Sequence, residues 1–327
     1  MLYLKYIIRK RRVIMNLGQK VKDFSNEIYR ECNLVYWDRD YENDDLIGAK
    51  RKFILELFQD SYISLERPDI SQNELSDVIF SISESLILSS VNYCFWSGLP
   101  NLRSGNASAG SIYKIYADLF RIYKEQHKPD TFSNDIRTGC RHFLQWMIPA
   151  FYNKLLLYRF PHMEARYRHL EEVRKYGDEF IIDLAHDIIR EKEGWHNIET
   201  LISVFPGFGD DIFLKRAFLF AIQLYRYFGF FDSIIDEIPV PADYHIPNVL
   251  QYFKFIRYNE GLKEKIKNKQ LLPSGSIEEM SIRAATILVC DDLARKTGWP
   301  ESGIDEVLFG LRKQIRDPFH LTVTTHY

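Results

Sequence analysis

Apolar residues recur along most of this chain three and four positions apart, the spacing of helices that bury one face. Strict alternation, the mark of a half-buried strand, is confined to residues 99–108 and 321–325. One candidate helix begins with a capping box formed by Ser276 and Glu279. The pattern predicts an all-α fold with minor β structure and helices at residues 15–32, 45–60, 72–95, 111–125, 133–158, 163–193, 211–228, 247–255, 261–269, 277–296 and 304–316.

The chain has 327 residues, of which 46% are hydrophobic and 27% charged, an ordinary composition for a globular protein. We expect a single domain over residues 15–327. Within it, the stretches rich in Gly and Pro, which interrupt helices, favour two helical lobes, approximately 15–130 and 131–327, with a cleft between them.

Residues 1–14 form a leader in which the basic run at 9–12 follows apolar residues, whereas a signal peptide carries its charges first. The leader is either a disordered basic arm or a stretch upstream of the true start at Met15. No apolar run reaches the roughly 18 residues that span a bilayer. We therefore expect a cytoplasmic protein with no membrane partner.

The net charge is −2 and the pI about 6.5. Proteins that bind nucleic acid neutralise its phosphates with an excess of Lys and Arg, so this balance argues against a nucleic-acid partner. Aromatic residues make up 15% of the chain, enough to fill a core and also line a pocket for a flat ligand. A small-molecule partner is expected, and the oligomeric state is left open.

The four cysteines form no CxxC pair, and the nine histidines include no HExxH motif. Neither a zinc site nor an iron–sulfur cluster is indicated. We therefore predict that the protein uses no metal and no cofactor, and that its cysteines are free thiols, at Cys32, Cys94, Cys140 and Cys290.

The most informative stretch is a helix that runs into Pro206-Gly207-Phe208-Gly209, from which a second helix leaves. The proline ends the first helix, and the glycines are expected to supply backbone angles that other residues resist. The element resembles the helix-hairpin-helix of DNA glycosylases. A plain tight turn between two helices also explains these four residues.

Asp243 lies downstream, two residues before His245 and just before a helix expected to start at Pro247. In the helix-hairpin-helix glycosylases, a Gly/Pro-rich loop leads to a catalytic Asp, often as Asp-x-His. Breaking an N-glycosidic bond builds positive charge on the ribose, which a carboxylate stabilises while it orients the attacking water. The alternative is that Asp243 only caps the helix.

The two residues after the hairpin argue against a DNA-repair enzyme. The lyase branch of those glycosylases carries its Schiff-base lysine here, whereas this chain has Asp210 and Asp211. We therefore expect no imine intermediate. Two acids at this point would also repel DNA phosphates.

Several motifs together resemble the queuosine-salvage family, over about residues 70–327. The resemblance implies a fold similar to helix-hairpin-helix DNA glycosylases and release of queuine from queuosine 5′-phosphate, for queuine salvage in tRNA modification. It rests on VNYCFWS at 91–97, EARY at 164–167, LKRA at 214–217, ADYHIP at 242–247, EMSIRA at 279–284 and PFHLTVTTHY at 318–327.

With this resemblance, the predicted site is centred on Asp243 as the catalytic residue. We expect Phe95 or Trp96 to stack on the 7-deazaguanine ring, unless they only pack in the core. Glu164 is expected to accept from N1–H and the 2-amino group, unless it only stabilises a helix start. Lys215 is expected to hold the 5′-phosphate, unless it is solvated. The remaining predicted substrate-binding residues are Arg166, Asp232, His245 and Tyr327.

Residues and resemblance together predict an N-glycoside hydrolase that releases queuine from queuosine 5′-phosphate or from queuosine. One alternative is a monofunctional DNA or RNA base glycosylase that uses the same aspartate; the acidic hairpin and the pI argue against it. The other is a non-catalytic protein that binds queuosine nucleotides, which an inert but ligand-binding chain would support.

Overall fold

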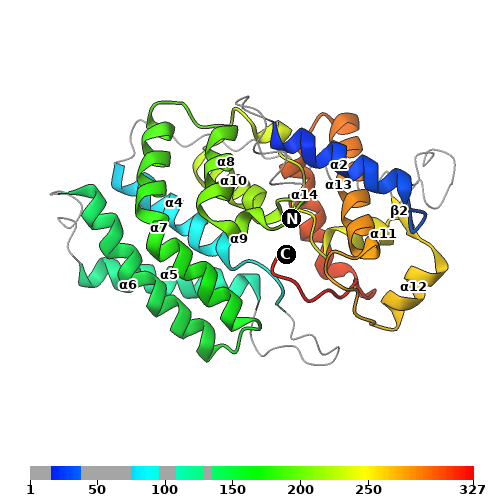
Figure 1. The fold of residues 1–327 in the computed structure, drawn as a ribbon, viewed down its shortest axis with the longest axis horizontal. Coiled ribbons are helices and arrows are strands. Elements are labelled where there is room, and N and C mark those ends of the chain that lie inside the picture. Colours follow the sequence, from blue (N-terminus) through cyan, green and yellow to red (C-terminus); the bar gives the residue numbers. More distant parts are fainter. Residues whose placement is uncertain (1–15, 38–74, 96–107, 128–134) are drawn as a thin grey trace.

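The computed structural model describes residues 16–37, 75–95, 108–127 and 135–327, and helices make up most of this part of the chain (Figure 1). The predicted all-α fold with minor β structure is confirmed. In chain order the helices are α2 (Leu17–Glu31), α4 (Leu75–Ser90), α5 (Ala109–Gln126), α6 (Ile136–Leu157), α7 (Met163–Ile189), α8 (Trp195–Val204), α9 (Pro206–Gly209), α10 (Lys215–Phe228), η3 (Ile235–Glu237), α11 (Ile246–Tyr252), α12 (Glu260–Lys267), α13 (Ile277–Thr297), α14 (Glu301–Leu311) and η4 (Arg312–Gln314).

Some expectations fall outside the described residues. They concern the leader at 1–14, the helix at 45–60, the side chain of Trp96 and all but the last residue of the strand candidate at 99–108. The expected boundary near residue 130 lies there as well. The division into two lobes with a cleft between them therefore stays a prediction.

Helices α4, α5, α6 and α7 pack together in the left half of Figure 1, where α7 contacts both α4 and α6. Helix α6 shows why the apolar spacing was informative. Its buried residues recur three and four positions apart along one face, as a helix that buries a single stripe requires. They are Gly139, Cys140, Phe143, Leu144, Met147, Ile148, Phe151 and Leu155.

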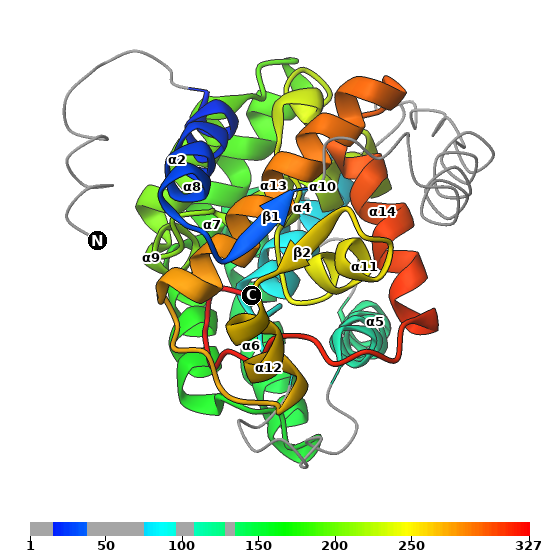
Figure 2. The same cartoon turned by 90° about the vertical axis from the view of Figure 1, so that its right-hand side faces the viewer.

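Helix α13 is the centre of the other half of the molecule, because it packs against α2, α11 and α14. A short antiparallel pair, β1 (Val35–Trp37) and β2 (Ile256–Tyr258), lies beside it (Figure 2). Val35 is opposite Tyr258 in this pair. Strands of three residues are too short for alternation to be recognised in a sequence, so neither was predicted.

Several predicted boundaries were wrong in informative ways. Helix α4 ends at Ser90 rather than at residue 95, and Cys94 in the irregular segment that follows has a left-handed φ of 31°. Helix α10 begins at Lys215 rather than at residue 211. The strand predicted at 321–325 is reduced to one isolated bridge, between Leu271 and Leu321.

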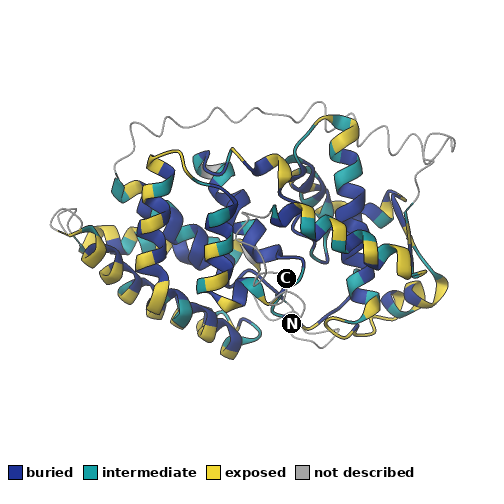
Figure 3. Cartoon of the chain, turned by 45° about the horizontal axis from the view of Figure 1, so that its top comes forward, coloured by how far each residue is buried: buried dark blue, intermediate teal, exposed yellow. Residues whose placement is uncertain are grey.

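Burial follows the helix packing, with exposed residues on the outer faces and buried residues where helices meet (Figure 3). The largest fully buried side chains include three cations, Arg166, Arg216 and Arg283. Charged side chains are rarely buried unless paired, so these arginines mark the region in which to look for a site. Within the described ranges, no helix is both long enough and apolar enough to cross a membrane.

Candidate active site around Asp243

The Pro206–Gly209 stretch forms a short helix, α9, between α8 and α10 rather than a tight turn, and its glycines have a different purpose from the one expected. Helix α8 runs into Pro206, and neither Gly207 nor Gly209 has a left-handed φ. A Cβ on Gly207 would lie 2.6 Å from Cδ2 of His169, and one on Gly209 would lie 3.0 Å from the carbonyl oxygen of Ile202. The expectation of unusual backbone angles was therefore wrong, and the glycines serve close packing instead.

The two acids after the hairpin differ from each other. Asp210 is partly exposed, and its carboxylate lies 3.4 Å from Nη2 of the buried Arg216. Asp211 is buried and forms an ion pair with Arg283, with Oδ2 at 2.7 Å from Nη2. The expected repulsion of DNA phosphates was wrong for Asp211, because its charge is neutralised inside the protein. The case against nucleic acid rests on the net charge.

Asp243 lies just before α11 and is partly exposed. Its Oδ1 accepts hydrogen bonds from the backbone N–H of His245 at 2.6 Å and of Ile246 at 3.1 Å. Within the described part of the chain, no hydrogen bond reaches Oδ2. One carboxylate oxygen is thus held by the backbone, and the other has no hydrogen-bond donor among the described residues.

Three positively charged or titratable side chains act on Asp243. Lys215 is buried at the start of α10, where its Nζ donates to the Asn92 carbonyl at 3.0 Å. Burial lowers the pKa of Lys215 to about 8, against the opposing charge of Asp243. Burial likewise lowers the pKa of Arg312 and of His245, and Asp243 again opposes the shift. Asp243 therefore lies near two cations, Lys215 and Arg312, and a histidine whose lowered pKa favours its neutral form.

A second acid, Asp305, and a second histidine, His320 of the motif at 318–327, also interact with Asp243, and the sequence analysis did not assign the acid. Burial raises the pKa of Asp305 to about 6, against the effect of Arg226, and Asp243 raises it further. Burial lowers the pKa of His320 to about 3. Asp305 follows Ile304 on the buried face of α14, and an acid within an apolar stripe was the available signal.

The irregular segment after α4 is held by the buried cations. Arg166 donates from Nε to Pro161, from Nη1 to Val91 and from Nη2 to Tyr93 and Cys94, always to a backbone carbonyl. Arg216 and Lys215 hold the neighbouring carbonyls of the same segment, those of Ser90 and Asn92. The nitrogens of Arg166 are engaged within the protein, so these contacts support a structural position rather than the predicted contact with substrate.

The end of this segment meets the loop that carries Asp243. The backbone of Phe95 is hydrogen-bonded to Tyr244, and Cys94 N–H donates to the Tyr327 carbonyl at 2.8 Å. The Phe95 ring is partly buried, 6.1 Å from that of Phe160. The structure thus brings the predicted residues Phe95, Lys215, His245 and Tyr327 together around Asp243.

Two other predicted residues lie apart from these contacts. Glu164 is exposed in the first turn of α7, two residues after His162, whose Nε2 lies 3.2 Å from Sγ of Cys94. Asp232 lies in the turn after α10, where its charge acts on Glu193. The contacts therefore give Glu164 a place near the segment after α4, and the role of Asp232 in the site stays a prediction.

Aromatic rings border Asp243 as well. Tyr244 stacks on Phe319 with ring centroids 4.8 Å apart, and His245 meets Phe309 edge to face at 5.8 Å. The guanidinium of Arg312 lies 3.3 Å from the Phe309 ring centroid. Phe309, Phe319 and Arg312 are partly exposed, so a flat ligand beside Asp243 would meet aromatic surface and a cation.

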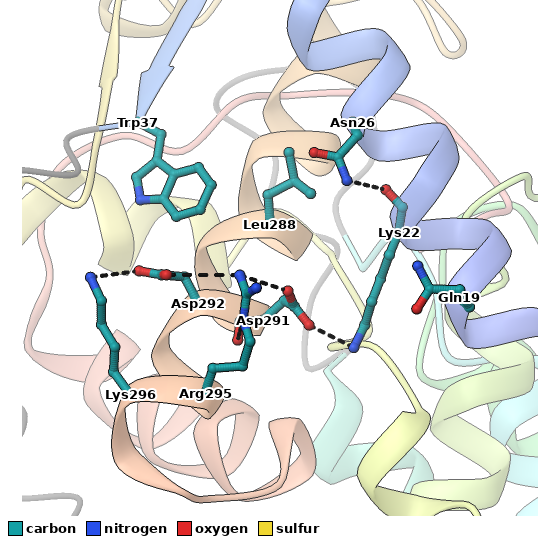
Figure 4. A pocket seen from close by; sticks show the side chains of 9 residues that line it. All are labelled: Gln19, Lys22, Asn26, Trp37, Leu288, Asp291, Asp292, Arg295 and Lys296. Carbon is teal, nitrogen blue, oxygen red and sulfur yellow. Dashed lines mark hydrogen bonds and ion pairs between the residues drawn. The ribbon is translucent and has the colours of Figure 1, made fainter.

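The described residues contain no group of three or more His, Cys, Asp or Glu side chains placed to hold a metal ion. Independence from metals and cofactors stays a prediction. A cavity of about 640 Å³ lies elsewhere, between α2 and α13, with Trp37 and Leu288 in its lining (Figure 4). Its charged residues pair with one another, as Lys22 does with Asp291 at 2.7 Å, and no predicted site residue lines it. We therefore do not place the site there.

Fold and site together define a helical protein whose site is centred on a carboxylate, Asp243. In the chain, this residue follows the short Pro-Gly element at 206–209. The chain belongs to the queuosine salvage protein family, whose model matches residues 82–327.

Three relatives carry the name queuosine 5′-phosphate N-glycosylase/hydrolase. The protein from Dictyostelium discoideum is 25% identical over 346 aligned positions, which cover 96% of both chains. The protein from Sphaerobacter thermophilus is 29% identical over 64% of this chain and 68% of its own. The mouse protein is 26% identical over 41% of this chain and 44% of its own.

Proposed function

We propose that this chain hydrolyses the N-glycosidic bond of queuosine 5′-phosphate and releases queuine, for queuine salvage in tRNA modification. The observation that carries the proposal is the carboxylate of Asp243, which is partly exposed, anchored through Oδ1 and without a protein donor at Oδ2 among the described residues. The names of the relatives supply the substrate.

The chemistry assigns Asp243 the catalytic role. As the base leaves, positive charge develops on the ribose, and a fixed carboxylate stabilises that charge without having to reorganise. The same carboxylate orients the water that attacks the anomeric carbon. The backbone bonds to Oδ1 fix the direction in which Oδ2 points, so the helix-capping role and the catalytic role of Asp243 belong together.

The cations near Asp243 suit the 5′-phosphate of the substrate. Arg312 is partly exposed, and its guanidinium retains donors beyond the one that Phe309 accepts. Lys215 is buried behind the site, where its charge acts on Asp243. We place the phosphate against Arg312, and Lys215, which is bonded to Asn92, contributes only its charge.

The base is proposed to lie on the other side of Asp243, toward the segment after α4. Phe95 offers a ring there, with Trp96 next in the chain, outside the described residues. Glu164 is proposed to accept hydrogen bonds from the guanine-like edge. His245 and Tyr327 line the site, and Arg166 contributes by holding the carbonyls that lead to Phe95. Asp232, in the turn after α10, stays a proposed substrate-binding residue.

The test is single-turnover release of queuine from queuosine 5′-phosphate, followed by mass spectrometry. The change Asp243→Asn keeps the shape of the side chain and a good helix cap but removes the charge. We expect the rate to fall by about 10²–10⁴ while the substrate still binds and the melting temperature is retained. Asp236→Asn, an exposed acid of η3, is the matched control and should cleave normally.

The other outcomes separate the alternatives. A wild-type protein that binds queuosine 5′-phosphate but releases no base is a binding protein. Release of bases from DNA or RNA but not from the nucleotide would make it a nucleic-acid glycosylase. An Asp243→Asn variant that cleaves at a nearly normal rate would remove Asp243 from the mechanism.

A further inference from the structure

Asp211, the second acid after the hairpin, holds the turn from which α10 begins. Its Oδ1 accepts from the backbone N–H of Phe213 at 3.1 Å, and its Oδ2 accepts from that of Lys215 at 3.0 Å. Between them, Leu214 has a left-handed φ of 52° and no side-chain cap. Asp211 therefore fixes the backbone that carries Lys215.

Arg283, from the middle of α13, grips the same carboxylate with two nitrogens. Nη1 lies 2.9 Å from Oδ1 of Asp211, and Nη2 lies 2.7 Å from Oδ2. The guanidinium is 4.5 Å from the ring centroids of both Phe213 and Tyr327. A planar group with two hydrogen bonds and two aromatic contacts has little freedom to move.

The remaining nitrogen of Arg283 reaches the loop that carries the catalytic residue. Nε donates to the carbonyl of Ala242 at 3.1 Å, and Ala242 is the residue directly before Asp243. Glu279 joins this ion pair, with Oε1 at 3.4 Å from Nη1 of Arg283. The Asp211–Arg283 pair is thus bonded to the backbone of Lys215 on one side and to the backbone beside Asp243 on the other. These are the two residues whose opposite charges act on each other in the site.

Stability alone does not explain this ion pair. Both side chains are almost completely buried, and desolvating two charges generally offsets most of what their attraction gains. A bidentate pair does, however, set geometry more strictly than apolar packing. We propose that Asp211 and Arg283 are positioning residues that fix the carboxylate of Asp243 relative to the ammonium of Lys215. This inference rests on the proposed function.

The test measures the rate of the chemical step and the binding of substrate separately. Arg283→Lys keeps the positive charge but loses the bidentate contact with Asp211 and the hydrogen bond to the Ala242 carbonyl. Asp211→Asn keeps the shape but loses the charge, and it serves as the second variant if Arg283→Lys does not fold. We expect single-turnover release of queuine to slow about 10- to 100-fold, with the dissociation constant of queuosine 5′-phosphate within about twofold of wild type.

Asp178→Asn is the matched control. Asp178 is another buried acid held by an arginine, since Arg141 Nε donates to it at 2.8 Å, but this pair joins α6 to α7 and has no bond to the site. We expect this variant to melt at a lower temperature and to cleave at the wild-type rate. A loss of rate in Asp178→Asn as large as that in Arg283→Lys would assign both to general destabilisation.

A double variant gives a readout that a merely structural role would not affect. If Arg283 acts through Asp243, Asp243→Asn combined with Arg283→Lys should be about as slow as Asp243→Asn alone. Effects that multiply, or a folded Arg283→Lys variant with the wild-type rate, would overturn the positioning role. Absence of cleavage by the wild-type protein would instead overturn the proposed function.

Discussion

Two clusters in this molecule bury side chains of different chemistry. The aromatic cluster between α4, α5 and α6 packs Phe143 against Phe80, Phe120 and Tyr123, with the Phe143–Phe80 centroids 5.2 Å apart. The charged cluster around Asp243 consists of Asp211, Lys215, Arg216, Arg283 and Asp305. Phe143 and Tyr123 are buried and Phe80 and Phe120 are partly exposed, whereas the second cluster buries charges that would be better hydrated outside.

The difference in chemistry between the two clusters indicates which of them is the better candidate for a functional site. An apolar cluster lowers the free energy of the fold, and residues of similar volume replace one another there with modest effect. A cluster of buried charges stabilises little relative to apolar packing, so its geometry has another use. We interpret the aromatic cluster as contributing to stability and the charged cluster as contributing to function, and three predictions test that division.

The largest expected effect is on stability, in the aromatic cluster. Phe143→Ala removes a fully buried ring and should lower the free energy of unfolding by about 3–5 kcal/mol. Urea denaturation measures that loss. At a temperature where the variant is still folded, queuine release per folded molecule should equal that of wild type. A rate more than about tenfold lower would show that this cluster also shapes the site.

The next effect is on substrate preference, at the edge of the charged cluster. Arg312→Gln removes the partly exposed cation proposed to meet the phosphate, so queuosine 5′-phosphate should bind about 10- to 100-fold more weakly. Binding of queuosine, which lacks the phosphate, should not change, and titration calorimetry compares the two ligands. Lys313→Gln, at the exposed neighbour, is the control. Equal weakening of both ligands would place Arg312 elsewhere in the mechanism.

The smallest expected effect is on pH dependence. Burial among Asp243, Arg283, His245 and Tyr327 lowers the pKa of His320 to about 3, so this ring stays neutral in the folded protein. An unfolded histidine takes up its proton near pH 6.5, and stability is therefore lost as the pH falls from there. Between pH 6.5 and pH 5 the contribution of His320 is about 2 kcal/mol.

Measuring wild type against His320→Gln isolates this contribution. Asp305 and Glu301 titrate in the opposite sense, because burial raises the pKa of each, to about 6 and about 7. Their effect is shared by both proteins and cancels in the comparison. The variant should lose less stability on acidification, as read by urea denaturation at the two pH values. Parallel curves would mean that His320 is protonated in the folded state.

The sequence predicted most of the helices because their packing follows a regular apolar stripe, as α6 illustrates. It also located the break between α8 and α10, since Pro and Gly leave a readable mark, whereas the catalytic role of Asp243 stays a prediction. Short-range bonds were harder. Asp211 delays the start of α10 by binding two backbone N–H groups, and a left-handed Cys94 follows an α4 that ends early. Neither effect has a periodic signature.

Some residues that interact with Asp243 could not be predicted from the sequence, for a different reason. Arg166 was predicted to touch substrate, yet it holds carbonyls of a segment more than seventy residues earlier in the chain. Arg312 and Asp305 reach Asp243 only because α14 packs on α11. Contacts of this kind are set by the tertiary fold, which no local pattern encodes.

The order of these pieces along the chain has a consequence for biosynthesis. The site is built from residues 90–95, 211–216, 242–246 and 319–327. In addition, β1 pairs with β2, although most of the sequence lies between the two strands. Contacts between distant segments form late, because the entropy of closing a long loop is lost before the contacts can stabilise the chain. A chain emerging from the ribosome therefore has Asp243 well before it has Phe319 and Tyr327, which pack around it. We expect catalytic competence to be acquired after translation of this whole stretch, in a single late step.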